Sequence, residues 1–157
     1  RIDHLSLPQE ALMELFVESI ANREGICGLR GHPNPVSMWK GVKFNDWREI
    51  YSVDWERSEL KGSIHLKLLP QSLSQLNLRA NFLEGSIDLA ALPHRLTHVY
   101  IEKNRFSGEL CLDALPPTLV YLDVSENSFW GSMSLTNLPA SLCFLFLNEN
   151  EFVGIID

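Results

Sequence analysis

A pattern of 23 residues occurs four times between Leu69 and Asp157, and it constrains the fold more than any other feature of the chain. A proline, an asparagine and a glycine keep the same spacing in every copy. They are Pro70, Pro93, Pro116 and Pro139; Asn81, Asn104, Asn127 and Asn150; and Gly85, Gly108, Gly131 and Gly154. One such copy cannot bury its apolar face alone, so the copies are expected to stack into a solenoid with a continuous core. Coincidental leucines in an unrelated α/β domain would not keep three such columns in register.

Each marker has a physical role within one copy. Leu76 and Leu78 alternate with polar residues, which predicts a short strand with one buried face and hence a parallel concave sheet. Asn81 comes where the chain turns away, and its amide can satisfy backbone groups that the turn would bury. After the glycine, Ile87-x-Leu89 predicts a second short extended segment on the convex side. Four phenylalanines are expected to stack as an interior spine: Phe82, Phe106, Phe129 and Phe152.

These motifs resemble those of leucine-rich repeat proteins. A helix followed by Trp39-Lys40-Gly41-Val42 and by repeats with Asn-x-Phe/Leu-x-Gly-x-Ile resembles the amino-terminal cap and repeats of plant-type ectodomains. The Leu-Pro-x-x-Leu opening and the Ile-Asp-Leu ending resemble more closely the leucine-rich repeat proteins of kinetoplastids and related protists. The resemblance implies an α/β repeat solenoid with an N-terminal helical cap and a mostly irregular or short-strand convex side. Plant-type caps carry paired cysteines around this motif, whereas Met38 and Phe44 stand there in this chain, so no cap disulfide is expected.

The chain is predicted to form a single domain with three regions. Residues 1–45 are the expected N-terminal helical cap. Residues 46–68 are a degenerate first repeat, because a shift of 23 positions places apolar residues under the strand leucines of the next copy. Residues 69–157 then hold four regular repeats. Atypical terminal repeats are common in such arrays because one side meets a cap.

The cap is predicted to begin with an amphipathic helix over Leu7–Ala21. Ser6 and Gln9 have the spacing of a capping box at its start. The helix is expected to cover apolar surface at the open end of the solenoid. Three tryptophans are predicted to fill the core of the cap, with ligand stacking as the alternative: Trp39, Trp47 and Trp55.

Charge and cysteine content restrict the partner and the compartment. The net charge is −7, and the whole excess lies in residues 46–157, with 15 acidic against 8 basic side chains. Such a surface disfavours nucleic acid, and no apolar run is long enough to span a bilayer. Three widely spaced cysteines and the absence of an Asn-x-Ser/Thr sequon favour the cytoplasm. Because the first residue is Arg, a removed leader and a surface or secreted location stay open.

The outward positions of the concave sheet are the candidate binding site. They are predicted to form an aromatic patch with an acidic rim, consisting of His98, Tyr100, Glu102, Tyr121, Asp123, Phe144 and Phe146. Clustered exposed aromatics are typical of interaction hot spots, although aromatics also suit strand faces. The expected partner is another protein with basic residues around an apolar contact surface.

The sequence favours a non-catalytic protein–protein interaction module. No nucleophile stands at a recognisable spacing from His98, and no phosphate loop or metal motif is present. No catalytic residue, cofactor or metal site is therefore expected. Two alternatives stay open: a surface or secreted ligand-binding module, and a scaffold that self-associates through an uncapped C-terminal end.

Overall fold

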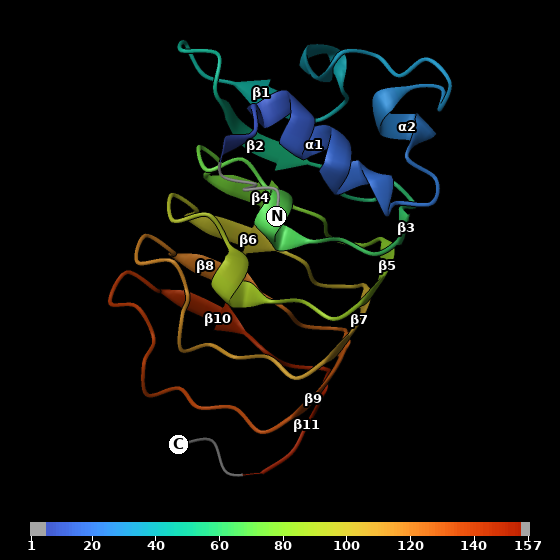
Figure 1. The fold of residues 1–157 in the computed structure, drawn as a ribbon. Helices are drawn as coiled ribbons and strands as arrows, with labels where there is room; N and C mark the ends of the chain where they lie inside the picture. Colours follow the sequence, from blue (N-terminus) through green and yellow to red (C-terminus); the bar gives the residue numbers. More distant parts are fainter. Residues whose placement is uncertain (1–5, 155–157) are drawn as a thin grey trace.

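Each 23-residue copy builds one turn of a solenoid with two short strands per turn. The computed structural model describes residues 6–154, so the last three residues of the fourth predicted repeat lie outside the described part. Figure 1 shows the turns stacked below a helical cap, which contains α1 (Gln9–Glu18) and α2 (Glu24–Cys27). The 3-10 helix η2 (Val36–Met38) belongs to the same end of the molecule. The expected solenoid with a helical cap is confirmed.

The first strand of every turn belongs to one six-stranded sheet, the concave sheet. Its parallel strands pair residues that are 23 positions apart, as Leu76 and Val99 do, so equivalent side chains form straight rows. The edge strand β1 is antiparallel to β2. In spatial order the strands are β1 (Val42–Phe44), β2 (Ile50–Asp54), β4 (Gln75–Asn77), β6 (His98–Tyr100), β8 (Tyr121–Asp123) and β10 (Phe144–Phe146).

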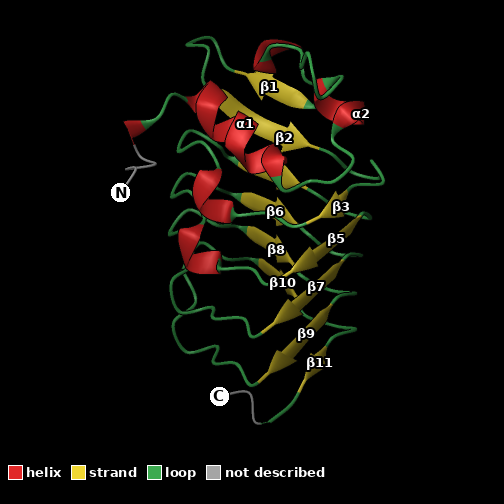
Figure 2. Ribbon diagram, turned by 45° about the vertical axis from the view of Figure 1, so that its right-hand side comes forward, coloured by secondary structure: helices red, strands yellow, loops and turns green. Residues whose placement is uncertain are grey.

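The second strand of each turn belongs to a five-stranded sheet, here the lateral sheet, which Figure 2 shows as a second column of strands. Partners in it are 21 positions apart, as Ser107 and Ser128 are, so each strand is displaced by two residues relative to the repeat period. An even displacement keeps every side chain on its own face. The strands are β3 (Lys61–Gly62), β5 (Phe82–Gly85), β7 (Arg105–Gly108), β9 (Ser128–Gly131) and β11 (Glu151–Phe152).

The second extended segment therefore ends at Gly85, and its prediction at Ile87-x-Leu89 was wrong. There the chain forms the 3-10 helix η4 (Leu89–Ala91), as it forms η3 (Leu66–Leu68) one turn earlier. The Asp88 carboxylate begins η4 by accepting a hydrogen bond of 3.1 Å from the backbone N–H of Ala90. An acidic side chain at that position favours a short helical turn over continued extension.

The aromatic spine exists, but Phe82 is not part of it. Phe106 and Phe129 stack at 6.4 Å between ring centroids, and Phe129 and Phe152 stack at 6.5 Å. The residue that continues this column in β5 is Leu83, which is fully buried, whereas Phe82 is 41 % exposed under the Arg105 guanidinium. The two residues are neighbours on a strand, so only one of them can point inward.

The asparagines form a ladder of amides along the interior, in which Asn81 is buried and Asn104, Asn127 and Asn150 are partly buried. Asn104 shows the arrangement: its Oδ1 accepts a hydrogen bond of 3.1 Å from the Leu83 N–H of the preceding turn. Its Nδ2 donates to the carbonyl of Leu78 at 2.9 Å and to that of Ile101 at 3.1 Å. Because the partners lie in two successive turns, each amide joins its own repeat to the one before.

The cap packs its apolar helix face on the solenoid end, with four buried side chains: Leu12, Met13, Phe16 and Val17. The helix is shorter than predicted, and its N-cap residue is Pro8 rather than Ser6, with no side-chain cap from Pro8. Gln9 instead donates to the Arg48 carbonyl at 2.7 Å and accepts from the Ile50 N–H at 2.8 Å, which joins α1 to β2.

The tryptophans of the cap differ in their burial. Trp39 and Trp55 are buried, as predicted, but Trp47 is 82 % exposed and contributes nothing to the core. It lies in a turn that Asn45 holds, since the Asn45 Oδ1 accepts from the Trp47 N–H at 3.0 Å and from the Glu49 N–H at 2.9 Å.

Within residues 6–154, no helix has both the length and the apolar character of a membrane span.

Candidate functional site

The outward positions of the concave sheet form two rows of side chains that change character along the solenoid, and two of these side chains, Ser52 and Asp123, are buried. Each row starts with small or polar residues at the cap end and finishes with aromatic ones. The first row is Ser52, Gln75, His98, Tyr121 and Phe144; the second is Asp54, Asn77, Tyr100, Asp123 and Phe146. The straight register of this sheet places these residues on adjacent strands.

The aromatic residues of the two rows form one continuous group, the aromatic cluster of His98, Tyr100, Tyr121, Phe144 and Phe146. Tyr121 is its centre, with its ring centroid 4.7 Å from that of Tyr100 and 5.4 Å from that of Phe146. Its distances to the rings of His98 and Phe144 are 6.1 and 5.8 Å. Phe144 is 54 % exposed and Phe146 39 %, so the cluster presents apolar surface to solvent. The sequence prediction that these five side chains meet is confirmed.

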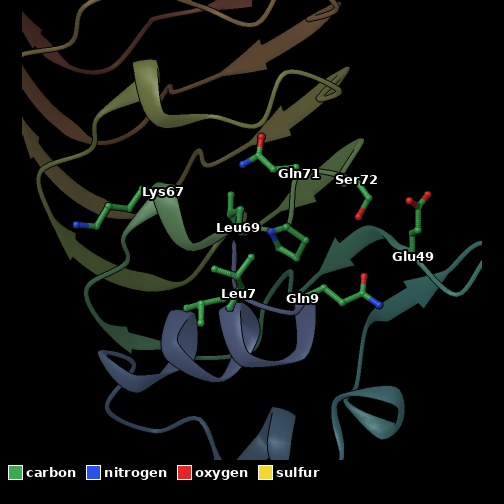
Figure 3. A pocket seen from close by; sticks show the side chains of 9 residues that line it. Leu7, Gln9, Glu49, Lys67, Leu69, Gln71 and Ser72 are labelled. Atoms are coloured by element: carbon green, nitrogen blue, oxygen red, sulfur yellow. The ribbon is translucent and has the colours of Figure 1, made fainter. Parts of the chain in front are cut away.

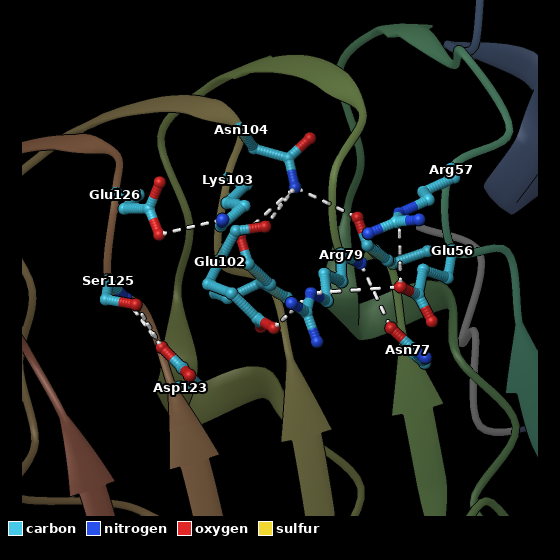
Figure 4. A network of polar contacts seen from close by, with 12 residues as sticks. Glu56, Arg57, Asn77, Arg79, Glu102, Lys103, Asn104, Asp123, Ser125 and Glu126 are labelled. Carbon is cyan, nitrogen blue, oxygen red and sulfur yellow. Dashed lines mark hydrogen bonds and ion pairs between the residues drawn. The ribbon is translucent and has the colours of Figure 1, made fainter.

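The predicted acidic rim is organised differently. Glu102 and Asp123 were expected as exposed neighbours of the patch, but both carboxylates are buried beside it. Figure 4 shows them in an acidic network, which we define as Glu56, Arg79, Glu102, Asp123 and Ser125. Arg79 places its Nε 3.1 Å from the Glu102 Oε1 and 3.8 Å from the Glu56 Oε1. Glu56 also pairs with Arg57, whose Nε lies 3.6 Å from the same oxygen. Asp123 uses Oδ1 to accept from the Ser125 N–H at 2.9 Å and from its hydroxyl at 2.6 Å.

The surroundings of Glu102 in this network disfavour the charged form of its carboxyl. Burial raises the pKa of its carboxyl, and the nearby charge of Asp123 adds to the rise, while hydrogen bonding from its own backbone and the Arg79 guanidinium oppose it. Its Oε2 atom is buried and has no hydrogen-bond partner among residues 6–154. Burial also raises the pKa of the Tyr121 phenol, with Asp123 and Glu102 contributing, so that hydroxyl stays protonated at neutral pH. The region therefore holds uncompensated negative charge beside exposed rings.

The site offers little for catalysis or metal binding. The His98 Nδ1 lies 2.9 Å from the Thr97 hydroxyl, and the imidazole stacks on the two tyrosines rather than pairing with a carboxylate. In the described part of the chain, no group of three or more His, Cys, Asp or Glu side chains is arranged to hold a metal ion. Cys27 is buried, which raises the pKa of its thiol, and Cys111 and Cys143 are exposed free thiols.

A hollow with a volume of about 310 Å³ lies between α1 and the turn before β4 (Figure 3). Its walls combine leucines with polar side chains, and two of these polar side chains bond the backbone of the neighbouring elements. The Gln9 amide bonds the backbone of β2 and its preceding turn, and the Ser72 hydroxyl donates to the Ile50 carbonyl at 2.7 Å. This hollow lies at the junction of cap and solenoid, away from the aromatic cluster.

Arg79 is the functional residue that sequence reasoning left outside the site. The signal for it was available, because Glu56, Arg79 and Glu102 occupy the same position in three successive turns. In a straight-register sheet, charges that alternate in sign along such a column are neighbours. The Asn77 Oδ1 helps to hold this position by accepting from the Arg79 N–H at 3.1 Å.

Comparisons with known proteins identify the fold through solved structures. Neither the models of protein families nor the curated proteins give a match. A chain of the BIR3–SERK2 complex from Arabidopsis thaliana matches with a TM-score of 0.70 and 24 % identity over 92 % of this chain and 83 % of that one. The BIR2 ectodomain from the same plant matches with a TM-score of 0.73 and 19 % identity, over 95 % and 83 %.

A third match is the complex of PEPR1 with AtPEP1, with a TM-score of 0.61 and 17 % identity over 92 % of this chain and 28 % of that one. Two of these three structures are complexes with a second molecule. At these identities the similarity concerns the fold. The protein is accordingly a leucine-rich repeat solenoid of the kind found in plant ectodomains.

Proposed function

We propose that this protein is a non-catalytic interaction module that binds another protein on its concave face through the aromatic cluster. The observation that carries the proposal is the cluster itself, in which Tyr121 contacts four other rings and Phe144 stays 54 % exposed. Rings held against each other in this way lose little conformational freedom on binding and bury a large apolar area.

The fold supports the same function. A solenoid presents an extended surface, and the residues at its outward positions can vary because they do not pack in the core. Solved structures with this fold include BIR3 with SERK2 and PEPR1 with AtPEP1, each of which pairs two molecules. The interior columns of the present chain repeat the same residues, whereas the two outward rows change at every turn. Variation at exposed positions is what a specific partner requires.

The test is photo-crosslinking from two defined positions. A benzoylphenylalanine side chain would replace Phe146 in the cluster, and in a matched protein it would replace Trp130, which is 50 % exposed on the lateral sheet. We expect a discrete crosslinked protein from position 146, removed by excess native protein and retained when the competitor carries Tyr121→Ser and Phe144→Ser. Equal crosslinking from both positions, or equal competition by the double variant, would place recognition elsewhere.

A further inference from the structure

The second outward row places a carboxylate between two aromatic rings. In the concave sheet Asp123 pairs with Tyr100 on one neighbouring strand and with Phe146 on the other. Tyr121 precedes Asp123 by two residues on the same face, and its ring contacts both of those rings. A carboxylate bordered by three aromatic faces has the chemistry of a site for an organic cation, because ring faces and carboxylates both attract positive charge.

The charges around this point are not balanced. Arg79 pairs with both Glu56 and Glu102, and Glu56 has a second partner in Arg57. In residues 6–154 no ion pair is formed by Asp123. The hydrogen bonds of Asp123 run to Oδ1. In the described part of the chain, two buried atoms of the network have no hydrogen-bond partner, the Oε2 of Glu102 and the Nε of Arg79. Buried polar atoms are nearly always paired in native proteins, so an unpaired carboxylate oxygen indicates a missing partner.

The wider face has the same sign. The outward positions of the concave sheet and of the turns that follow its strands contain more acidic than basic side chains. The acidic ones are Asp54, Glu56, Glu102, Asp123, Glu126 and Glu149; the basic ones are Arg57, Arg79 and Lys103. Such a surface attracts positively charged partners and repels acidic ones.

We propose that the aromatic cluster, together with Asp123 and Glu102, binds one Arg or Lys side chain of an extended polypeptide segment, with an apolar residue of the same segment seated against Phe144. This inference rests on the proposed protein-binding function and names the chemistry of its partner. The cation lies over the ring faces of Tyr100 and Tyr121. Its N–H groups donate hydrogen bonds to the carboxylates. The exposed ring of Phe144 provides the apolar contact.

The experiment is a selection of random dodecapeptides displayed on phage against the native chain, followed by affinity measurements with synthetic copies of the enriched peptides. We expect enriched peptides to carry Arg or Lys within a few residues of an apolar side chain. Replacing that Arg by citrulline, which keeps the shape and removes the charge, should weaken binding about tenfold or more, as loss of a charge-assisted hydrogen bond does.

The protein side of the experiment uses Glu102→Gln and Asp123→Asn, with Glu84→Gln on β5 of the lateral sheet as the matched control. Both site variants should lose most of their preference for Arg over citrulline, and the control should keep it. The citrulline comparison uses the native chain, so it stays decisive if a site variant does not fold.

Three outcomes separate this inference from the function on which it rests. Basic peptides that depend on Glu102 or Asp123 support it. Peptides that bind without a basic residue, yet are lost with Tyr121→Ser and Phe144→Ser, overturn the cation site and leave concave-face binding in place. If no enriched peptide depends on the aromatic cluster, or the selection yields no binder, both proposals fail.

Discussion

The asparagine ladder and the outward rows of the concave sheet lie in the same turns and behave in opposite ways. Asn81, Asn104 and Asn127 are identical residues with nearly identical hydrogen bonds, each joining two successive turns. The outward rows change from each turn to the next, passing from Ser52 and Asp54 at the cap end to Phe144 and Phe146. The interior therefore specifies stacking, and the outward rows are free to specify a partner.

The largest expected effect is on the interior. Asn104→Ala removes three hydrogen bonds of 2.9–3.1 Å to the backbone and leaves one partly buried N–H and two partly buried C=O groups without this partner. Each orphaned group costs about 1 kcal/mol or more, so we expect the free energy of unfolding to fall by about 3–4 kcal/mol. Urea denaturation followed by circular dichroism measures it.

The matched change on the outward row of the same turn is Tyr100→Ser. It removes the ring contact with Tyr121 at 4.7 Å and no backbone partner, so about 1 kcal/mol or less is expected. Equal decreases in the free energy of unfolding for Asn104→Ala and Tyr100→Ser would mean that the outward row stabilises the fold as much as the asparagine ladder does.

A smaller effect separates two neighbours on β5. Leu83→Ala empties a fully buried position in the spine and should cost about 3 kcal/mol. Phe82→Ala removes a larger side chain, but one that is 41 % exposed and lies under the Arg105 cation, so about 1 kcal/mol is expected. A lower urea midpoint for Phe82→Ala than for Leu83→Ala would indicate that Phe82, and not Leu83, contributes to the aromatic spine.

These two residues also show how far the sequence could predict the molecule. The proline, asparagine and glycine columns identified the solenoid and the straight register because interior positions repeat. The side-by-side apolar pair Phe82 and Leu83 is ambiguous by one residue, and only the pairing of β5 decides which one points inward. The predicted burial of Trp47 was wrong for a related reason, since the turn that contains it is held by the side chain of Asn45 and not by apolar packing.

The candidate site divides in the same way. Its aromatic members follow from alternation within the strands and were predicted. The burial of Glu102 was not, because it stands beyond the strand, where the alternation no longer fixes direction. Its environment is set by Arg79 and Asp123, which come from neighbouring turns and are adjacent only when the turns stack.

The raised pKa of Glu102 makes a prediction about pH. Burial disfavours its charged form in the folded state, so the fold is penalised above the folded pKa and relieved as pH falls towards the unfolded value. We expect the native chain to gain stability relative to Glu102→Gln between neutral pH and about pH 4, where an unfolded glutamate titrates. Urea denaturation of the two proteins across this range measures the difference.

Other groups that face Glu102 also titrate or carry charge, namely Glu56, Arg79, Asp123 and Tyr121. They are present in both proteins, so the difference between native chain and variant isolates Glu102. Glu84→Gln on the lateral sheet is the control for the loss of one surface carboxylate. A stability difference that stays constant with pH would show that Glu102 is as well solvated when folded as when unfolded.

The smallest effect concerns the residue before each asparagine, which has a left-handed backbone. Ala80 has a φ of 55° although it has a Cβ atom, and Lys103 and Glu126 at the equivalent positions have 57° and 52°. Left-handed geometry costs a non-glycine residue about 1–2 kcal/mol, and glycine returns about 0.5–1 kcal/mol of that through its greater freedom when unfolded. Ala80→Gly should therefore raise the free energy of unfolding by about 0.5 kcal/mol.

The control is Ala90→Gly, which lies in η4 and does not have a left-handed backbone. This replacement should lower the free energy of unfolding by a similar amount, so the two variants should move the urea midpoint in opposite directions. If both lower it, the turn before the asparagine is held by the ladder so firmly that its backbone strain no longer matters to stability.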